Sequence, residues 1–299
     1  MSRAGRQGAR STGAPGGGAV PGGPVEGSWQ VAGGTARLTN EPSGSAGWQL
    51  AVDDVPQSHV DLGDPTVLVF EYVRWIGGLL DCLAEPGEEL RTVHVGGGAG
   101  TLARYVAATR PGSHQVVLDP DAALLEVVRE QLGLRSGGRL KVRAVDGRIG
   151  LAGCRAHSFD VVVRDAFADA GVPTSLVTTQ WVEAVVGVLR PGGVLVCNLP
   201  DSTPFPCTRA EVATLRTRFA HVLAVAEPGT LRGRRTGNVV LVASDAPLPE
   251  ATWARRLAGD AVAPVRLMDA GQVRDRFGGG TPLDDAGPFL APPPRPRFR

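Results

Sequence analysis

A regular alternation of short apolar runs and helix-like segments begins at Arg91 and constrains the fold more than any other feature of the sequence. Runs rich in β-branched residues predict strands over residues 92–95, 115–118, 140–145, 159–163, 193–198, 221–226 and 238–243. Helical segments lie near residues 100–109, 121–132, 175–189 and 208–219. Strands joined by helices of this length form parallel sheets. The pattern predicts an α/β domain with a mostly parallel, seven-stranded sheet and helices on both faces.

The first of these predicted strands leads directly into a glycine-rich turn, Gly-Gly-Gly-Ala-Gly at residues 96–100, and a helix is expected from Thr101. Glycine permits positive φ and lets backbone N–H groups approach a ligand closely, next to the free donors of a helix N-terminus. We therefore expect Gly96, Gly98 and Gly100 to bind the adenosyl part of a nucleoside. The dinucleotide spacing Gly-x-Gly-x-x-Gly fails at Thr101, which disfavours NAD. The alternative is a tight turn without a ligand, in a chain that contains 41 glycines.

Carboxylates follow three further predicted strands. Asp119 comes directly after residues 115–118, Asp146 follows residues 140–145, and Asp165 closes the run that starts at residue 159. Because the carboxyl ends of parallel strands meet at one edge of a sheet, we expect these side chains to line one crevice. Asp119 would accept hydrogen bonds from the ribose hydroxyls, and Asp146 would meet the adenine amino group. The alternatives are a helix cap at Asp119 and an Asp-Gly turn at Asp146.

At these motifs the sequence resembles the spermidine synthase family, the polyamine aminopropyltransferases that share the Rossmann-like class I S-adenosylmethionine-dependent methyltransferase fold. Residues 96–100 are similar to the family's Gly-Gly-Gly-Asp-Gly turn, and Val-Leu-Asp at 117–119 is similar to its Glu-hydrophobic-Asp. Asp-Gly-Arg at 146–148 matches its Asp-Gly-Arg, which adds Gly147 to the expected nucleoside site. Phe-Asp-Val-Val-Val-Arg-Asp at 159–165 looks like the strand that ends on the family's catalytic Asp, so the resemblance implies this role for Asp165.

The resemblance extends upstream, so that it covers roughly residues 45–245. Val-Asp-Asp-Val-Pro-Gln at residues 52–57 is similar to the end of the family's Leu-Asp-Gly-x-x-Gln hairpin, and Asp64 with Tyr72 resembles the acid and tyrosine that follow it. The resemblance implies that Gln57 and Tyr72 contact the substrate. It also accounts for a small N-terminal β element ahead of the sheet.

Three positions depart from the family pattern, and all three lie in the expected site. Ala99 replaces the acid that the family uses on the aminopropyl side, and Val117 stands where the family has its ribose-binding Glu. Ala-Phe-Ala-Asp at residues 166–169 replaces Ser-Ser-Asp-Pro, so the second amine-binding acid is missing or has moved to Asp169. Asp64 and Asp201 are further acids that could compensate.

The resemblance implies transfer of an aminopropyl group from decarboxylated S-adenosylmethionine to a small-molecule amine. The amine must be uncharged to attack, and Asp165 is the expected proton acceptor. A methyltransferase that uses S-adenosylmethionine itself is the first alternative, although His94 stands where many methyltransferases carry an acid. The second alternative is a non-catalytic relative that keeps the fold as a binding module, because three family positions are changed.

Composition limits the remaining possibilities. The formal charge is +1, from 31 basic and 30 acidic residues, which disfavours a nucleic-acid or anionic membrane partner. The four cysteines lack Cys-x-x-Cys spacing, so we expect neither a metal site nor disulfides, and no apolar run is long enough to cross a membrane. We expect a cytoplasmic protein. A homodimer is implied by the resemblance alone.

We divide the chain into five segments. Residues 1–27 and 278–299 are rich in Gly and Pro and are expected to be disordered tails. Residues 28–62 form the small β element, residues 63–245 the Rossmann-like adenosyl-binding domain, and residues 246–277 a C-terminal helical extension.

Overall fold

The computed structural model describes residues 23–41, 46–168, 171–259 and 264–287. In these residues a large sheet has the strand order β12-β10-β11-β9-β8-β5-β6-β7. Its strands are β5 (Arg91–Val95), β6 (His114–Asp119), β7 (Leu140–Ala144), β8 (Phe159–Arg164), β9 (Leu189–Asp201), β10 (His221–Ala226), β11 (Gly237–Ser244) and β12 (Arg266–Met268). All pairs among β5–β9 are parallel, and the pairs that involve β10–β12 are antiparallel. The predicted α/β fold with a mostly parallel sheet is confirmed.

The sheet has one strand more than the seven that the sequence predicts. Strand β12 pairs with residues 224–226 of β10 and covers an edge that would otherwise present unpaired backbone groups. A three-residue strand gives almost no periodic signal, which explains why sequence patterning misses it.

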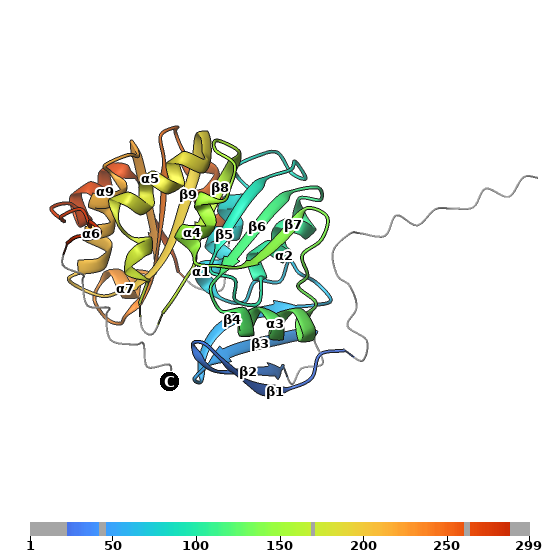
Figure 1. Cartoon of the computed structure of the whole chain (residues 1–299). Coiled ribbons are helices and arrows are strands. Elements are labelled where there is room, and N and C mark those ends of the chain that lie inside the picture. Colours follow the sequence, from blue (N-terminus) through green and yellow to red (C-terminus); the bar gives the residue numbers. More distant parts are fainter. Residues whose placement is uncertain (1–22, 42–45, 169–170, 260–263, 288–299) are drawn as a thin grey trace, which may run out of the picture.

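Helices cover both faces of the large sheet (Figure 1). They are α1 (Glu71–Leu80), α2 (Thr101–Thr109), α3 (Ala122–Leu132), α4 (Gly147–Ala152), the 3₁₀ helix η1 (Thr174–Leu176), α5 (Thr179–Val188), α6 (Pro206–Leu215), α7 (Pro228–Leu231), α8 (Glu250–Gly259) and α9 (Ala270–Phe277). One face buries Trp181 of α5 and Phe277 of α9, and the other buries Trp75 of α1 and Trp253 of α8. Burial of each such side chain stabilises the fold by roughly 1.5–3 kcal/mol.

A separate four-stranded antiparallel sheet precedes the large one. Its strands β1 (Gly27–Val31), β2 (Gly34–Asn40), β3 (Gly47–Val52) and β4 (Val55–Asp61) pair in sequence order. Figure 1 shows this small sheet beside α3, at the lower edge of the large sheet. A third apolar cluster joins the two: it contains Leu38, Trp48 and Leu50 of the small sheet together with Leu124 and Val128 of α3. The small sheet is therefore packed directly against the strand ends that carry the candidate site.

The Arg-Pro-Gly-Gly sequence at residues 190–193 lies inside β9 and does not form a separate turn between α5 and β9. Strand β9 already begins at Leu189, which pairs with Phe159, whereas Val194 pairs with Val161. The intervening residues form an irregularity inside the strand, and Gly192 has φ +75° there. Glycine takes this backbone conformation without strain, so the Pro-Gly-Gly sequence forms a bulge and does not separate the two elements.

The C-terminal part of the chain contains α8 and α9, and strand β12 lies between them, so residues 246–277 are not purely helical. Residues 278–287, expected to be disordered, contact the domain. The Leu283 N–H donates to Thr214 Oγ1 at 2.8 Å, and the Leu283 carbonyl accepts from the Thr179 N–H at 2.8 Å. The backbone N–H and carbonyl of Leu283 are thus hydrogen-bonded to α6 and α5, and these bonds hold this segment against the domain. The first strand begins at Gly27, and residues 1–22 and 288–299 lie outside the described residues.

Candidate active site

The backbone ladder of the large sheet places the predicted site residues side by side at one edge. The Asp165 N–H donates to the Val95 carbonyl at 2.8 Å, and the Gly96 N–H donates to the Leu118 carbonyl at 2.9 Å. Likewise the Val145 N–H donates to the Asp119 carbonyl at 2.9 Å. The order along the edge is therefore Asp146, Asp119, the glycine turn and Asp165. The structure brings these residues together as the sequence predicts, while their roles toward a ligand stay predictions.

The glycines of the turn are needed by the packing of the protein itself. Gly96, Gly98 and Gly100 have φ values of +95°, +44° and +74°. A Cβ at Gly96 would lie 2.1 Å from the Asp165 carbonyl oxygen, and one at Gly98 would lie 2.3 Å from Ser58 Oγ. Such distances are far below van der Waals contact. Glycine at these positions is thus explained by close packing of β4, β8 and the turn, whether or not a nucleoside binds.

The backbone donors of the turn are also engaged within the protein. The Gly97 N–H donates to Asp119 Oδ2 at 2.7 Å, the Ala99 N–H to Ser58 Oγ at 3.1 Å, and the Gly100 N–H to the Gly97 carbonyl at 2.8 Å. A ligand would therefore meet this turn through its Cα and carbonyl groups or displace one of these bonds. The expectation that free N–H groups bind the nucleoside is not met in the turn as it stands.

Asp119 lies under the turn and is 8% exposed. Besides the Gly97 N–H, its carboxylate accepts the Asp121 N–H at 2.9 Å. Burial raises the pKa of Asp119, and the backbone hydrogen bonds from Asp121 and Gly97 partly offset that rise. Asp119 is not the helix cap. Asp121 caps α3 instead, because its carboxylate accepts the Leu124 N–H at the start of that helix.

Asp146 caps a helix that the sequence pattern did not predict. Its Oδ1 accepts the N–H groups of Arg148 at 2.9 Å and Ile149 at 3.1 Å, which satisfies two free donors of α4. Among the described residues, Oδ2 accepts no hydrogen bond. The next residue, Gly147, has no space for a side chain, because a Cβ there would lie 2.3 Å from Val95 Cγ1. Ile149, directly after this cap, is 68% exposed.

Asp165 has a different environment, built from side chains. Its Oδ1 accepts a hydrogen bond from Asn198 Nδ2 at 3.0 Å, and its carboxylate also accepts one from the Tyr72 hydroxyl. Burial raises the pKa of Asp165, and the hydrogen bonds from Asn198 and Tyr72 act in the opposite direction. Burial and the adjacent carboxylate raise the pKa of Tyr72 well above its ordinary value, so the phenol stays protonated and donates.

Two residues of this arrangement were not predicted from the sequence. Asn198 is fully buried at the end of β9, and its Oδ1 has no hydrogen-bond partner among the described residues. Arg164, also fully buried, donates to the Asn198 carbonyl at 3.0 Å and forms a buried ion pair with Glu211 of α6. An arginine inside the apolar run Val-Val-Val-Arg-Asp was the available signal, because a buried charge requires a partner.

The remaining predicted residues differ in what the structure shows. Gln57 is the extra residue of a bulge in β4, since Leu50 pairs with Ser58 and Ala51 with Pro56. Its side chain has no hydrogen-bond partner among the described residues, so it can serve a ligand. Bulges of this kind frequently re-aim a side chain beside a site. Asp169 lies outside the described residues.

Neither of the other two acids considered as replacements joins Asp165. Asp64 is exposed and closes a local turn by accepting the Thr66 N–H at 2.9 Å. Asp201 is fully buried, and its carboxylate accepts the Thr208 N–H and hydroxyl, each at 2.7 Å. Both carboxylates are therefore occupied by local structure.

His94 is part of the core rather than of the site. One ring nitrogen lies 2.9 Å from Gln115 Oε1, and Gln115 Nε2 donates to the Ala103 carbonyl at 3.0 Å. Burial lowers the pKa of His94 to about 4, so the ring is neutral at neutral pH. It therefore cannot supply the negative charge that an acid at this position would carry.

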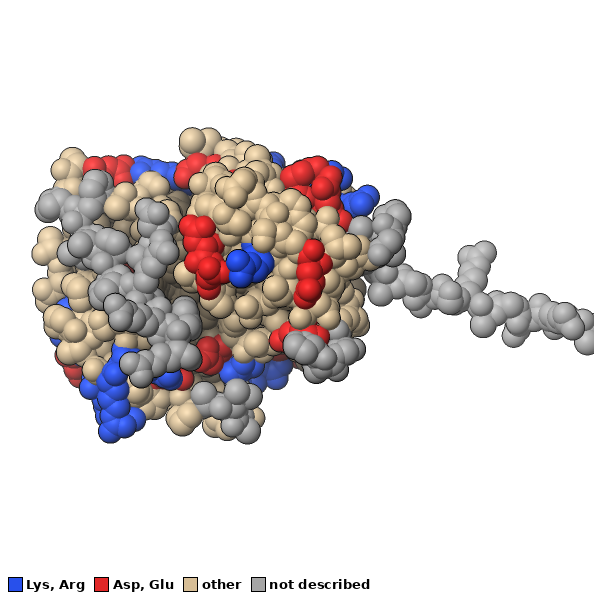
Figure 2. All heavy atoms as spheres, turned by 90° about the horizontal axis from the view of Figure 1, so that it is seen from below, with Lys and Arg blue, Asp and Glu red and all other residues tan. Residues whose placement is uncertain are grey.

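The described residues contain no cluster of His, Cys, Asp and Glu that could hold a metal ion. None of their helices is long and apolar enough to span a membrane. Figure 2 shows that acidic and basic residues are interspersed on the face that carries the small sheet, outside the grey atoms.

A solved structure of a probable spermidine synthase from Corynebacterium glutamicum is 32% identical to this chain. The match covers 90% of this chain and 100% of the other, with a TM-score of 0.82. The chain belongs to the spermidine synthase-like family. A family model of the methyltransferase domain matches residues 93–195, in agreement with the class I methyltransferase fold of that family.

Curated relatives of the family agree in name. The polyamine aminopropyltransferase 2 of Pseudomonas aeruginosa is 31% identical over 229 residues, which cover 67% of this chain and 63% of the relative. The chain spans about half the length of other curated aminopropyltransferases that it matches, 45%, 58% and 53% in three of them. Spermidine synthase from Thermotoga maritima, at 15% identity and a TM-score of 0.56, shares the fold.

Proposed function

We propose that this spermidine synthase-like protein transfers an aminopropyl group from decarboxylated S-adenosylmethionine to a small amine. The observation that carries the proposal is the position of Asp165 between the glycine turn, the Tyr72 hydroxyl and the Asn198 amide. Asp165 ends the strand next to the turn, and both of its side-chain partners orient its carboxylate. A carboxylate held in this way beside a nucleoside site is equipped to accept a proton from an attacking amine.

The reaction balances with Asp165 as the base. The amine nitrogen forms a bond to the methylene carbon next to the sulfonium, and that carbon–sulfur bond breaks with its electron pair going to sulfur. Methylthioadenosine leaves, and the proton of the attacking nitrogen passes to the Asp165 carboxylate. Because burial raises the pKa of Asp165, this carboxylate is a better proton acceptor than an exposed one.

The other end of the edge fits the nucleoside part of the same substrate. Asp146 Oδ2 accepts no hydrogen bond from the described residues and is available to an adenine amino group. The exposed Ile149 beside it offers an apolar face to the ring. Asp119 already accepts backbone hydrogen bonds from Asp121, Gly97 and Gly98, and its remaining lone pairs are available to a ribose hydroxyl.

The proposal is tested by calorimetric titration with decarboxylated S-adenosylmethionine, S-adenosylmethionine and methylthioadenosine, followed by a polyamine product assay. We expect tighter binding of the decarboxylated form than of S-adenosylmethionine. We also expect Asp165→Asn to lower kcat by roughly 10²–10⁴-fold while the protein stays folded.

Asp160→Asn is the matched control, because it removes a carboxylate at the opposite end of the same strand, where Asp160 pairs with Arg190. Preference for S-adenosylmethionine with methyl transfer would replace the proposal by a methyltransferase activity. Absence of binding of all three compounds would leave a non-catalytic relative.

A further inference from the structure

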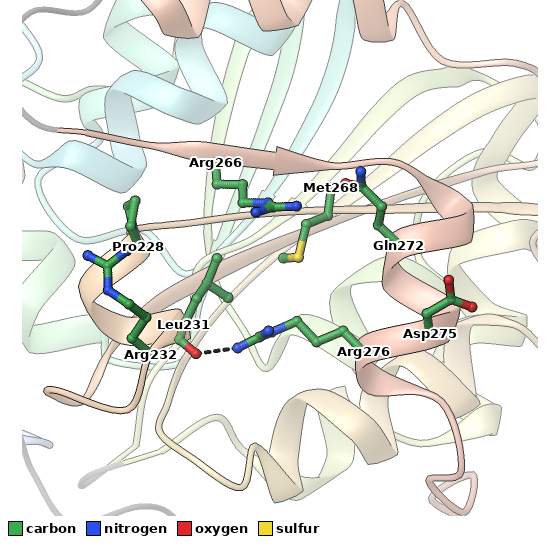
Figure 3. Close-up of a pocket in the computed structure, with 8 residues that line it drawn as sticks. All are labelled: Pro228, Leu231, Arg232, Arg266, Met268, Gln272, Asp275 and Arg276. Carbon is green, nitrogen blue, oxygen red and sulfur yellow. Dashed lines mark hydrogen bonds between the residues drawn. The ribbon is translucent and has the colours of Figure 1, made fainter.

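A recess opens at the edge of the large sheet that β12 forms. It has a volume of about 430 Å³, which lies in the range of small-molecule sites. Its walls come from α7 and the turn after it, from β12 and from α9 (Figure 3). The lining residues are Pro228, Leu231, Arg232, Arg266, Met268, Gln272, Asp275 and Arg276. We call it the arginine pocket.

The arginine pocket is separate from the candidate active site. Strand β10, which precedes α7, lies three strands away from β8 in the order β8-β9-β11-β10. At a strand spacing of about 4.8 Å this places the pocket roughly 14 Å along the edge from Asp165. None of its lining residues contacts Asp165, Asp119 or Asp146 through the hydrogen bonds of the described residues.

Its charge is strongly one-sided. Three guanidinium groups and one carboxylate line the pocket. The guanidinium groups of Arg232 and Arg266 have neither an ion-pair nor a hydrogen-bond partner among the described residues. Asp275 does not neutralise them, because its ion contact is with Arg274, Nε to Oδ1 at 3.8 Å, outside the pocket. Figure 3 shows Asp275 at the opposite side of the pocket from Arg232.

The third arginine is held in place. Arg276 donates a hydrogen bond to the Leu231 carbonyl, drawn as a dashed line in Figure 3. Its guanidinium carbon lies 5.6 Å from the ring centroid of Phe205 and 5.8 Å from that of Phe277. A planar guanidinium held by one hydrogen bond and two cation–π contacts keeps other N–H groups free for a bidentate contact.

The pocket also has an apolar floor. Leu231 and Met268 are buried in the core, and Figure 3 shows their side chains between Arg266 and Arg276. We propose that the arginine pocket binds a small molecule that carries a phosphate or carboxylate group together with an apolar part. The guanidinium groups of Arg232, Arg266 and Arg276 contact the oxyanion, and Leu231 with Met268 contacts the apolar part.

The experiment uses the full chain and two anionic probes, pyrophosphate and citrate, titrated calorimetrically at low ionic strength and constant pH. We expect saturable binding of at least one probe. Arg232→Gln and Arg266→Gln should each weaken it roughly tenfold, because each removes a charge-assisted hydrogen bond. The probe that binds more tightly distinguishes a phosphate-bearing from a carboxylate-bearing ligand.

Arg234→Gln is the matched control: it removes the same charge from the same exposed turn, and Arg234 does not line the pocket. Asp275→Asn should tighten binding, which a misfolded variant would not do. Binding of neither probe, or equal weakening in Arg234→Gln, would overturn the proposal. The outcome is independent of the proposed reaction, because anion binding should be unchanged in Asp165→Asn.

Discussion

The two halves of the candidate site differ in what their carboxylates already do. In the nucleoside half, Asp119 and Asp146 accept backbone N–H groups of the glycine turn and of α4. In the transfer half, Asp165 is contacted by the side chains of Tyr72 and Asn198. The carboxylates proposed to bind the nucleoside therefore already have a structural role. In the transfer half, the carboxylate of Asp165 accepts hydrogen bonds from side chains only among the described residues, which is consistent with the proposed role as a base.

Ala99, at the junction of the halves, should give the largest effect on stability. It is fully buried in the third apolar cluster, so the acid that the family places here would lie largely among apolar side chains. We expect Ala99→Asp to lower the free energy of unfolding by about 3–5 kcal/mol, as an unpaired buried charge does. Chemical denaturation measures this. Ala99→Asn is the uncharged control and should cost clearly less, so equal losses would show that size rather than charge is decisive.

Asp119 tests the structural role of the nucleoside half. Asp119→Ala leaves the partly buried N–H groups of Gly97 and Asp121 without acceptors, and we expect a loss of about 2–3 kcal/mol in the free energy of unfolding. Asp119→Asn keeps one acceptor oxygen and should lose less. Measurement of both unfolding and methylthioadenosine binding separates the two roles. Stability equal to the wild type in Asp119→Ala would contradict the division drawn between the halves.

The order of these halves along the sheet was predictable from sequence, because strand ends of a parallel sheet must meet at one edge. The positions of Asp119, Asp146 and Asp165 followed from that rule alone. What sequence could not give is which atoms are already engaged. Asp121 rather than Asp119 caps α3, because the helix begins two residues later than a cap at Asp119 requires. Ser58 accepts the Ala99 N–H, and this contact joins segments that are 41 residues apart in the sequence.

Asn198 and β12 were missed for a related reason. Asn198 is a polar residue within an apolar strand, and the pattern of the strand alone gives it no function. Only the parallel pairing of β8 with β9 brings its side chain to Asp165. Strand β12 is defined by its pairing with β10 rather than by its own three residues. The contact of Asn198 with Asp165 and the formation of β12 both depend on pairing with a distant strand. The local pattern of apolar residues gives no information about that pairing.

Asp146 should give a smaller effect than Asp119, because it caps the partly exposed start of a short helix. Asp146→Ala removes the acceptor for two N–H groups of α4, and an N-cap of this kind contributes about 1 kcal/mol. We expect that loss in the free energy of unfolding, measured by denaturation. Asp146→Ser preserves a capping oxygen and should recover most of the stability without recovering nucleoside affinity. Recovery of both would reduce Asp146 to a helix cap.

Tyr72 gives the smallest change in stability and the sharpest test of the transfer half. Its hydroxyl stabilises the ionised form of Asp165, so Tyr72→Phe removes an interaction that lowers the pKa of that carboxyl. The pKa of Asp165 then rises further, and the base is lost to protonation at a higher pH. We expect the acid side of the kcat profile to move toward higher pH, with an unfolding free energy within about 1 kcal/mol of the wild type.

Asn198→Ala should move the profile in the same direction, since its amide has the same effect on Asp165. A uniform loss of kcat with an unmoved profile would mean that Tyr72 and Asn198 position the substrate and do not tune the base.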